Sequence, residues 1–428
     1  MTGNQDMLND KIDEKLSFSI IFFFIIQSAN STIKTVFPNL GNGFNAALSI
    51  GSGLVILYML LSSMKEVYKM HPFVLIRSYA LFGVIYIISI IQNVMRGAPI
   101  DVLLKESMLW TMVWWIPMGL ICYSIKNRLI LYRTMLKWSY VLSVVTLLSV
   151  YAYFMNIIDV NVEMLNRGNY NMFFSYMLVL PLIIHLNEII DNRNIKALFF
   201  FLFELIGILV YGSRGALLCV VSFSILKFLI GGLKTITKFR LSVLVILLVS
   251  AFLLGVSAIA EDLEDAGLTS RTLEMFIDGS VSESDGRGSL RTYTMELISE
   301  RPLLGYGLGG EFSELYSKAY GVPAKPGEYS SLTPHNGFLQ LILNFGICVG
   351  LIVCIIIVIP ILWIRQVRDM NCRILLIILF SVYIVPSLTV SDGIFIKPGI
   401  ALYLFLVLRW CHDLRKESKE IVYEYSKS

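Results

Sequence analysis

The sequence predicts an all-α integral membrane protein with about twelve transmembrane helices and one large extracytoplasmic loop. Of its 428 residues, 56% are hydrophobic and 15% are charged, whereas soluble domains are about 45–50% apolar and about 25% charged. The mean hydropathy is +0.72. Apolar runs of about 18 or more residues recur along the whole chain, and a run of this length crosses a bilayer as a helix. A single long polar stretch, near residues 261–337, interrupts them.

Twelve candidate spans lie near residues 16–37, 44–64, 73–94, 107–124, 138–157, 169–188, 196–211, 215–231, 241–260, 338–362, 374–390 and 394–411. The first nine occupy residues 16–260 and the last three occupy residues 338–411. Between these two sets lies the loop of residues 261–337. Residues 1–15 and 412–428 form the two tails.

The positions of Lys and Arg predict the orientation, because cytoplasmic loops of membrane proteins carry an excess of both residues. One set of loops and both tails hold most of them: Lys11, Lys15, Lys65, Lys69, Lys126, Arg128, Arg133, Lys137, Arg193, Lys196, Lys234, Lys238, Arg240, Arg365, Arg368, Arg373, Arg415, Lys416 and Lys419. The short loops of the opposite side hold Lys34, Arg96, Lys105, Arg167, Arg214 and Lys397. Both termini are therefore predicted to be cytoplasmic, and the loop of residues 261–337 to be external.

The same sequence excludes several kinds of protein. The first apolar stretch lacks an Ala-x-Ala-like cleavage site, which indicates a retained helix after a cytoplasmic tail. All six cysteines lie in or beside apolar spans and none forms a CxxC pair, so a disulfide framework in the loop is excluded. The loop also lacks an Asp-x-Asp pair, and we expect no metal and no other cofactor. The net charge of +4 does not indicate nucleic acid as a partner.

Part of the external loop has a helical pattern. Leu290, Tyr293, Leu297 and Ile298 recur at near-helical spacing, and Pro302 follows. This predicts a short amphipathic helix that lies on the membrane surface or packs against the transmembrane helices.

A glycine-rich run, Gly305–Gly310, comes directly after this predicted helix. It resembles a dinucleotide-binding fingerprint only superficially, because it follows Pro302 rather than a strand. We therefore expect the glycines to form a turn close to the membrane surface and not a nucleotide site.

Arg214 lies in a tight external turn, Tyr211–Ala216, with a glycine nearby on either side. A guanidinium offers planar, bidentate recognition of phosphate, and the adjacent glycines leave backbone N–H groups open. The alternative is an arginine that only marks a helix end by reaching to the interface. Because an external arginine runs against the charge bias, we favour the phosphate-binding interpretation.

His335 is the one histidine predicted to be external, since His71, His185 and His412 fall on the cytoplasmic side. An imidazole titrates near neutral pH and can accept a proton from a sugar hydroxyl. The alternative is a histidine that only caps a helix. Its position at the end of the large loop, downstream of several arginines, favours chemistry.

Four further residues complete the set of charged candidates. Arg287, Arg291 and Arg301 are external, and as a charge run they are also compatible with a solvated surface. Glu204 lies near the middle of the span at 196–211, where a carboxylate is costly and marks a functional hypothesis by default. We favour a paired, structural role for Glu204, because no external His or Arg is near it in sequence.

These motifs together resemble the O-antigen ligase/polymerase superfamily. The matching segments are Tyr211-Gly212-Ser213-Arg214-Gly215-Ala216, Gly286-Arg287, Arg301-Pro302-Leu303-Leu304-Gly305-Tyr306-Gly307-Leu308-Gly309, Pro334-His335-Asn336-Gly337-Phe338-Leu339-Gln340 and Phe345-Gly346-Ile347. The resemblance implies a GT-C-like fold in the bacterial cytoplasmic (inner) membrane. It also implies transfer of glycan from an undecaprenyl-pyrophosphate carrier at the external, periplasmic face.

The resemblance further implies roles for individual residues. Arg214 and Arg287 are expected to contact the donor pyrophosphate, and His335 to activate the acceptor hydroxyl. The other expected substrate-binding residues are Arg291, Arg301, Tyr211 and Asn336. Pyrophosphate is a good leaving group, so fixed positive charge can stabilise it without a metal ion.

Three functions remain open at this stage. The first is a polymerase of O-antigen or capsule, which extends a lipid-linked repeat unit, and the second is a ligase to a lipid-core or protein acceptor. The third, a twelve-span transporter or flippase, is disfavoured because no half-to-half repeat is found. We favour the polymerase because Val349 departs from the ligase-type spacing. The expected partners are the undecaprenyl-pyrophosphate-linked oligosaccharide, the lipid bilayer and, as a candidate, a chain-length regulator protein.

The topology yields a direct test. In a variant without the six native cysteines, Ser289→Cys should react in intact cells with a membrane-impermeant maleimide, because the loop of residues 261–337 is predicted to be external. Labelling that occurs only after permeabilisation would contradict the twelve-span topology.

Overall fold

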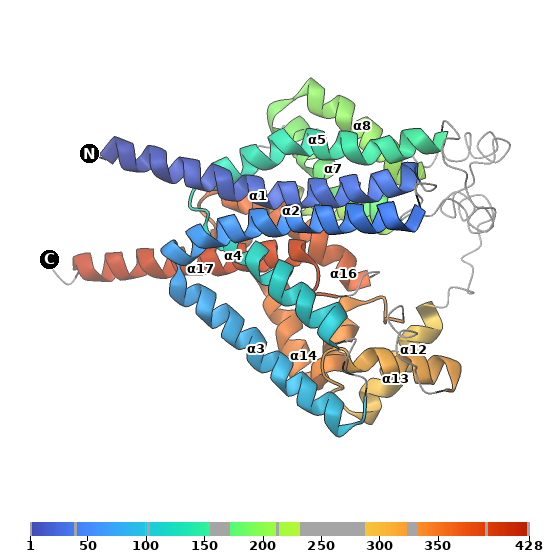
Figure 1. The fold of residues 1–428 in the computed structure, drawn as a ribbon. Coiled ribbons are helices and arrows are strands. Elements are labelled where there is room, and N and C mark those ends of the chain that lie inside the picture. Colours follow the sequence, from blue (N-terminus) through green and yellow to red (C-terminus); the bar gives the residue numbers. More distant parts are fainter. Residues whose placement is uncertain are drawn as a thin grey trace. The chain divides into compact units, whose positions relative to one another are not determined.

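The computed structural model describes residues 2–37, 41–98, 100, 103–154, 172–210, 214–231, 287–322, 332–389 and 393–425. Every regular element within them is helical (Figure 1). Six of the described helices are long and apolar enough to cross a membrane, namely Met7–Val36, Gly41–Met70, Pro72–Met95, Phe173–Asn192, Gly337–Gln366 and Met370–Leu388. These findings confirm an all-α membrane protein. Twelve spans remain a prediction, and the span expected at 241–260 lies outside the described residues.

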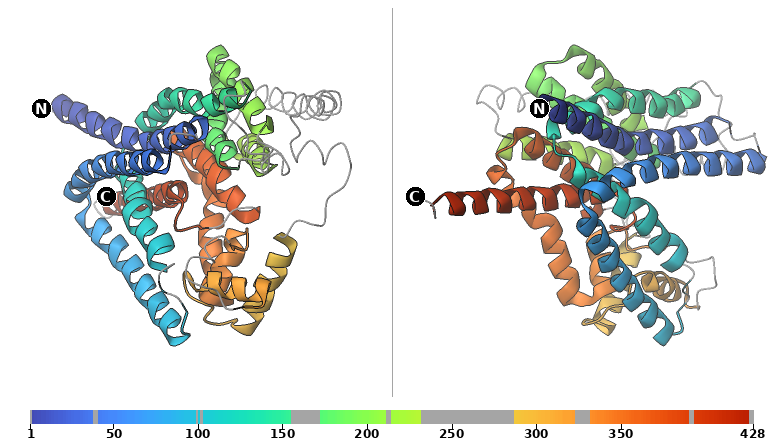
Figure 2. Two further views of the ribbon diagram at one scale, coloured as in Figure 1. Left: turned by 45° about the vertical axis from the view of Figure 1, so that its right-hand side comes forward. Right: turned by 60° about the vertical axis from the view of Figure 1, so that its left-hand side comes forward.

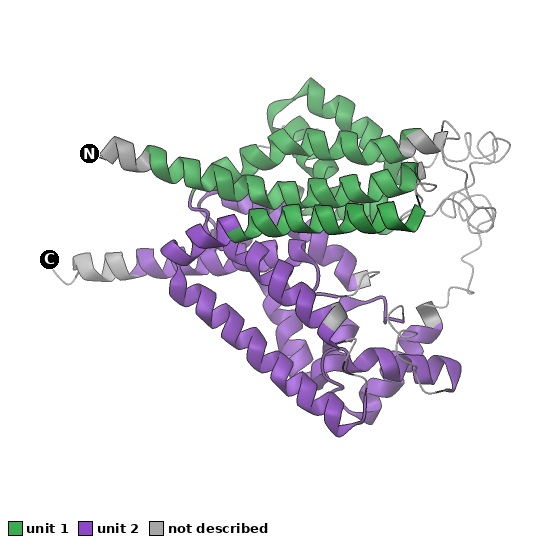
Figure 3. Cartoon of the chain, in the orientation of Figure 1, with its two compact units in different colours: residues 1–61, 127–282 green, residues 62–126, 283–428 purple. Residues whose placement is uncertain are grey.

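The chain divides into two compact units (Figure 3). Unit 1 is residues 1–61 and 127–282, and unit 2 is residues 62–126 and 283–428. The helices of unit 1 are α1 (Thr2–Val36), most of α2 (Gly41–Met70), α5 (Arg128–Phe154), α7 (Met172–Asn192), α8 (Ile195–Val210) and α9 (Arg214–Ile230). Those of unit 2 are α3 (Pro72–Met95), the π-helical η2 (Leu103–Met108) and η3 (Thr111–Trp115), α4 (Ile116–Ser124), α12 (Arg287–Glu300), α13 (Gly310–Tyr320), α14 (Gly337–Trp363), the 3₁₀ turn η4 (Ile364–Gln366), α15 (Met370–Leu379), the π-helical η5 (Phe380–Ile384), α16 (Val385–Thr389) and α17 (Pro398–Tyr425).

In unit 1, α1 and α5 run side by side and in the same direction (Figure 1). In the N-terminal halves of both helices, the rings of Phe18 and Trp138 have centroids 4.9 Å apart. Further along, the hydroxyls of Ser28 and Thr146 are hydrogen-bonded at 2.6 Å. Small hydroxyl residues let two membrane helices approach closely and satisfy each other's polar groups. The pair is therefore joined along most of its length.

Both predicted tails continue the helices next to them. α1 begins at Thr2, so the helix runs through most of the segment 1–15. α17 extends to Tyr425, well beyond the end of the last predicted span. The segments predicted as charged tails are therefore largely helical.

In unit 2, the span predicted at 107–124 is helical but contains two π-helical segments, η2 and η3, before α4. Its side chains reach the segment before α17. Thr111 Oγ1 donates to the carbonyl of Phe395 at 2.8 Å, and Trp115 Nε1 donates to the carbonyl of Ile394 at 2.9 Å. Buried polar groups at this depth need such partners, because no water replaces them.

The amphipathic helix predicted from Leu290 onward is present as α12. Leu297 and Ile298 are buried and pack in one cluster with Leu315 of α13 and Leu343 of α14. Figures 1 and 2 show α12 and α13 beside one end of α14. Of the two placements expected for this helix, the structure has the one in which it packs against its neighbouring helices.

α14 is broken inside its span. Gly346 has φ 77° and ψ 170°, outside the helical region. The carbonyls of Leu343 and Asn344 accept from the backbone N–H groups of Tyr306 and Gly307 at 2.9 and 2.8 Å. A non-helical backbone is tolerated in a membrane helix only where protein satisfies its polar groups. The glycine-rich run performs that function here.

The glycines of this run are required by backbone conformation and by space. Gly305, Gly307 and Gly309 all have positive φ, which confirms the predicted turn. A Cβ at Gly305 would lie 2.5 Å from the carbonyl oxygen of Leu343, and one at Gly346 would lie 2.1 Å from that of Leu303. The turn is thus built against α14, and no side chain fits between the two backbones.

Gly346→Ala should destabilise the protein, because alanine would both clash with the Leu303 carbonyl and adopt positive φ. The backbone conformation of Gly346, with positive φ and extended ψ, is essentially restricted to glycine and costs another residue about 1–3 kcal/mol. We expect a lower apparent melting temperature of the detergent-solubilised protein. Gly53→Ala in α2 is the matched control, since a Cβ there meets nothing within 4 Å. Equal melting temperatures of the two variants would contradict this account of the break.

Candidate functional site

His335 lies immediately before α14, at the positive end of its helix dipole. Its φ of 50° is in the left-handed region, which residues other than glycine adopt at a cost. Asn336, the next residue, is the N-cap. Its Oδ1 accepts from the N–H groups of Phe338 and Leu339, both at 3.0 Å, and its Nδ2 donates to the carbonyl of Leu388 at 2.7 Å. The backbone that carries the half-buried imidazole is therefore fixed from one side by the cap.

These contacts also define what Asn336 does in the described structure. Its amide caps α14 and joins it to α16, a positioning role for His335. A substrate contact from Asn336 stays a prediction.

A buried polar cluster surrounds Glu311, in the first turn of α13. Glu311 is 1% exposed. Its Oε1 accepts from Gln340 Nε2 at 3.0 Å and from Asn344 Nδ2 at 3.3 Å. Gln340 Oε1 accepts in turn from the backbone N–H of Gly393 at 2.7 Å. One carboxyl group thus ties α13 to the first turns of α14 and, through Gln340, to the segment before α17.

Two buried oxygens of this cluster, Glu311 Oε2 and Asn344 Oδ1, have no hydrogen-bond partner among the described residues. An ionised carboxylate offers only acceptors, whereas a protonated one supplies a donor. Burial raises the pKa of Glu311 from its ordinary 4.5 to about 7, against the opposing effect of the hydrogen bonds that it accepts. Glu311 therefore gains or loses a proton near neutral pH.

Arg96, at the C-cap of α3, holds the glycine-rich run from its other side. Its Nη2 donates to Asn93 Oδ1 at 2.6 Å and to the carbonyl of Tyr306, and its Nη1 lies 3.3 Å from Glu314 Oε1. The guanidinium also lies over the Tyr306 ring, 5.0 Å from its centroid. The side chain of Arg96 is 8% exposed. Arg96 joins α3 to α13 and so supports the cluster of Glu311.

The three predicted loop arginines belong to one segment of unit 2. Arg287 is the first residue of α12, and Arg291 is exposed one turn later. Arg301 follows the helix and lies 5.3 Å from the centroid of the Tyr306 ring. Because α12 packs against α14, this segment and His335 belong to one folded part of unit 2.

Arg214 is the first residue of α9, in unit 1. Tyr211 lies outside the described residues. That Arg214 shares a site with the residues of unit 2 stays a prediction.

Glu204 is paired within unit 1. Both it and His185 are 0% exposed, and His185 Nδ1 lies 2.8 Å from Glu204 Oε1. Ser143 donates to the same carboxylate, and His185 Nε2 lies 2.9 Å from Ser139 Oγ. The sequence favoured a structural role for Glu204, and this pairing across α5, α7 and α8 agrees with it. His185, which the sequence analysis assigned to the cytoplasmic side, is buried inside α7.

Among the described residues, no group of three or more His, Cys, Asp or Glu side chains could hold a metal ion. The cluster of Glu311 joins one carboxyl to the side-chain amides of Gln340 and Asn344 by hydrogen bonds.

A comparison with protein families bears on this arrangement. Residues 197–354 match the family described as O-antigen ligase. The matched range contains Arg214, Arg287 and His335, and it supports the resemblance to the O-antigen ligase/polymerase superfamily. No curated protein matches the chain.

The raised pKa of Glu311 predicts a pH-dependent stability. Since the folded-state pKa of about 7 exceeds the ordinary 4.5, the folded state binds the proton more tightly. The resulting stabilisation is complete below pH 4.5 and is lost as the pH rises to about 7. We expect the apparent melting temperature in detergent to fall between pH 5 and pH 8, because the free energy of unfolding decreases by on the order of 3 kcal/mol.

Glu311→Gln should remove most of this pH dependence, because its amide supplies a permanent donor. Glu296→Gln, on the exposed face of α12, is the control and should keep the dependence of the unchanged protein. An unaltered pH profile in Glu311→Gln would show that another group titrates.

Proposed function

We propose that this protein is a polysaccharide polymerase for O-antigen or capsule. It transfers glycan from undecaprenyl pyrophosphate to a lipid-linked repeat unit at the external face of the bacterial cytoplasmic membrane. Residues 197–354 match the family described as O-antigen ligase, which supports this proposal. The observation that carries this proposal is that the family match includes the three residues proposed to act on substrate, Arg214, Arg287 and His335.

Helix ends support the proposed electrostatics. Arg214 and Arg287 are the first described residues of α9 and α12, and His335 directly precedes Asn336, the N-cap of α14. The N-terminus of a helix carries partial positive charge and N–H groups that favour an anion. An arginine at such an end adds a full charge and a bidentate donor. These features suit a pyrophosphate whose negative charge increases as it leaves.

His335 acts as the base in this proposal. The imidazole accepts the proton of the acceptor hydroxyl, and the hydroxyl oxygen forms a bond to the anomeric carbon of the donor sugar. The bond from that carbon to the carrier phosphate breaks, and its electron pair stays on undecaprenyl pyrophosphate. The N-cap at Asn336 holds the backbone of His335 for this step.

A ligase is the second candidate, because the matched family is described as O-antigen ligase. The two reactions share the donor and differ in the acceptor. We favour the polymerase because Val349, just after the break in α14, departs from the ligase-type spacing. A chain-length regulator protein would then be a partner.

His335→Ala and Arg214→Ala should each abolish long polymer in cells and leave single repeat units, while the protein remains in the membrane. Loss of a general base lowers the rate by about 10²–10⁴-fold, and loss of a stabilising charge by about 10²–10³-fold. Gel analysis of the extracted polysaccharide measures both outcomes.

His412→Ala and Arg368→Ala are the matched controls, since both side chains are exposed, at 54% and 84%. They should keep normal polymer. Normal polymer from the His335 and Arg214 variants would refute their assignment. Full-length polymer left on the carrier would identify a ligase.

A further inference from the structure

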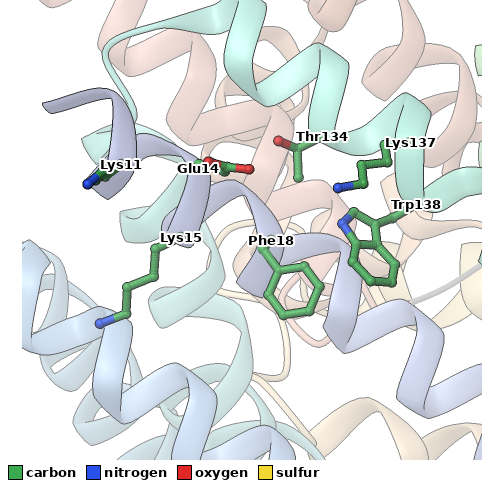
Figure 4. Close-up of a pocket in the computed structure, with 7 residues that line it drawn as sticks. All are labelled: Lys11, Glu14, Lys15, Phe18, Thr134, Lys137 and Trp138. Atoms are coloured by element: carbon green, nitrogen blue, oxygen red, sulfur yellow. The ribbon is translucent and has the colours of Figure 1, made fainter. Parts of the chain in front are cut away.

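A groove of about 400 Å³ lies between the N-terminal parts of α1 and α5, entirely within unit 1 (Figure 4). Its lining residues are Lys11, Glu14, Lys15, Phe18, Thr134, Lys137 and Trp138. Three of these are lysines and one is a carboxylate, so the groove carries a net positive charge. The function proposed above uses none of them.

The chemistry of the lining residues changes along the two helices, from basic before the predicted spans to aromatic inside them. Lys11 and Lys15 come just before the predicted span 16–37, and Lys137 just before the predicted span 138–157. Phe18 and Trp138 are the first aromatic residues inside these spans. Their rings lie against each other with centroids 4.9 Å apart. Because α1 and α5 run in the same direction, these lysines lie on the N-terminal side of both predicted spans.

This order matches the chemistry of a bilayer surface. Tryptophan is enriched at the boundary between acyl chains and headgroups, and phenylalanine packs on its apolar side. Lysines occupy the headgroup level, where they attract anionic lipids. All three lysines are exposed. Figure 4 shows Lys137 directed toward the space between the helices and Lys15 directed away from it. Thr134, which is 8% exposed, adds a hydroxyl beside them.

We propose that the groove between α1 and α5 binds the headgroup of an anionic phospholipid, with Lys137 contacting its phosphate and Lys11 and Lys15 adding positive charge to the same groove. The acyl chains of the lipid then lie along Phe18 and Trp138. The topology predicted from the sequence puts this groove on the cytoplasmic side, and the site does not depend on the proposed reaction.

Trp138 provides a fluorescent reporter of this lipid. The full-length protein is reconstituted in phosphatidylcholine vesicles that contain about 10 mol% brominated phosphatidylglycerol, an anionic lipid. Vesicles with about 10 mol% brominated phosphatidylcholine serve as the comparison. The difference in emission between the protein and Trp138→Phe isolates the Trp138 signal. We expect brominated phosphatidylglycerol to show an apparent affinity for the Trp138 site at least about tenfold that of brominated phosphatidylcholine. Equal quenching by the two lipids would refute the site.

The variant with Lys11→Ser, Lys15→Ser and Lys137→Ser should lose this preference. The matched control carries Lys65→Ser, Lys69→Ser and Lys416→Ser, which removes three exposed lysines of the same predicted side, and it should keep the preference. A preference that survives the first set, or disappears with both, would contradict a site in the groove. Glu14→Gln should raise the preference, because it removes the one negative charge of the lining.

The same assay separates a lipid from a soluble anion. Glycerol phosphate added at millimolar concentration should leave the quenching by phosphatidylglycerol unchanged, because the acyl chains contribute to binding. Displacement of the brominated lipid by glycerol phosphate would assign the groove to a soluble phosphate and overturn the proposal.

Discussion

The break in α14 at Gly346 is the constraint on which the arrangement around the candidate site depends. A membrane helix that leaves the helical conformation exposes carbonyls that lipid cannot satisfy. Here the carbonyls of Leu343 and Asn344 accept hydrogen bonds from backbone N–H groups of the glycine-rich run. That run must therefore follow the backbone of α14 closely, and its own glycines must allow it. α13, which directly follows the run, is held beside α14 as a consequence.

The buried cluster of Glu311 depends on this docking. Only when α13 lies against α14 can one carboxyl reach both Gln340 and Asn344. Gln340 lies one turn after the N-cap Asn336, so the cluster of Glu311 and the cap fix the same end of α14. His335 is positioned by that end. A proton on Glu311 thus bears on the stability of the segment that carries the proposed base, although the two residues have different roles.

The sequence predicted the elements whose signals are local. The spacing of Leu297 and Ile298 indicated α12, and Pro302 its end. The glycines of Gly305–Gly310 indicated a turn, and the structure gives three of them positive φ. The role of Glu311 could not be predicted in this way, because its partners lie 29 and 33 residues away and only the break in α14 brings them near. His185 and Glu204 are 19 residues apart, and their pairing depends on how α7 and α8 pack. Local patterns show which residues are helical, but not which buried polar groups meet.

Arg96 shows how far charge bias alone identifies a substrate-binding residue. Like Arg214, it is an arginine on the predicted external side, where few are expected. Yet Arg96 makes four hydrogen bonds to its own chain, and an arginine has five N–H donors in all. Little of its guanidinium is left for a phosphate. The bias against external arginine therefore selects two kinds of residue, those that clamp the fold and those that bind an anion. The number of donors that remain after the protein's own acceptors are counted distinguishes them, and this criterion applies to Arg214 and Arg287 as well.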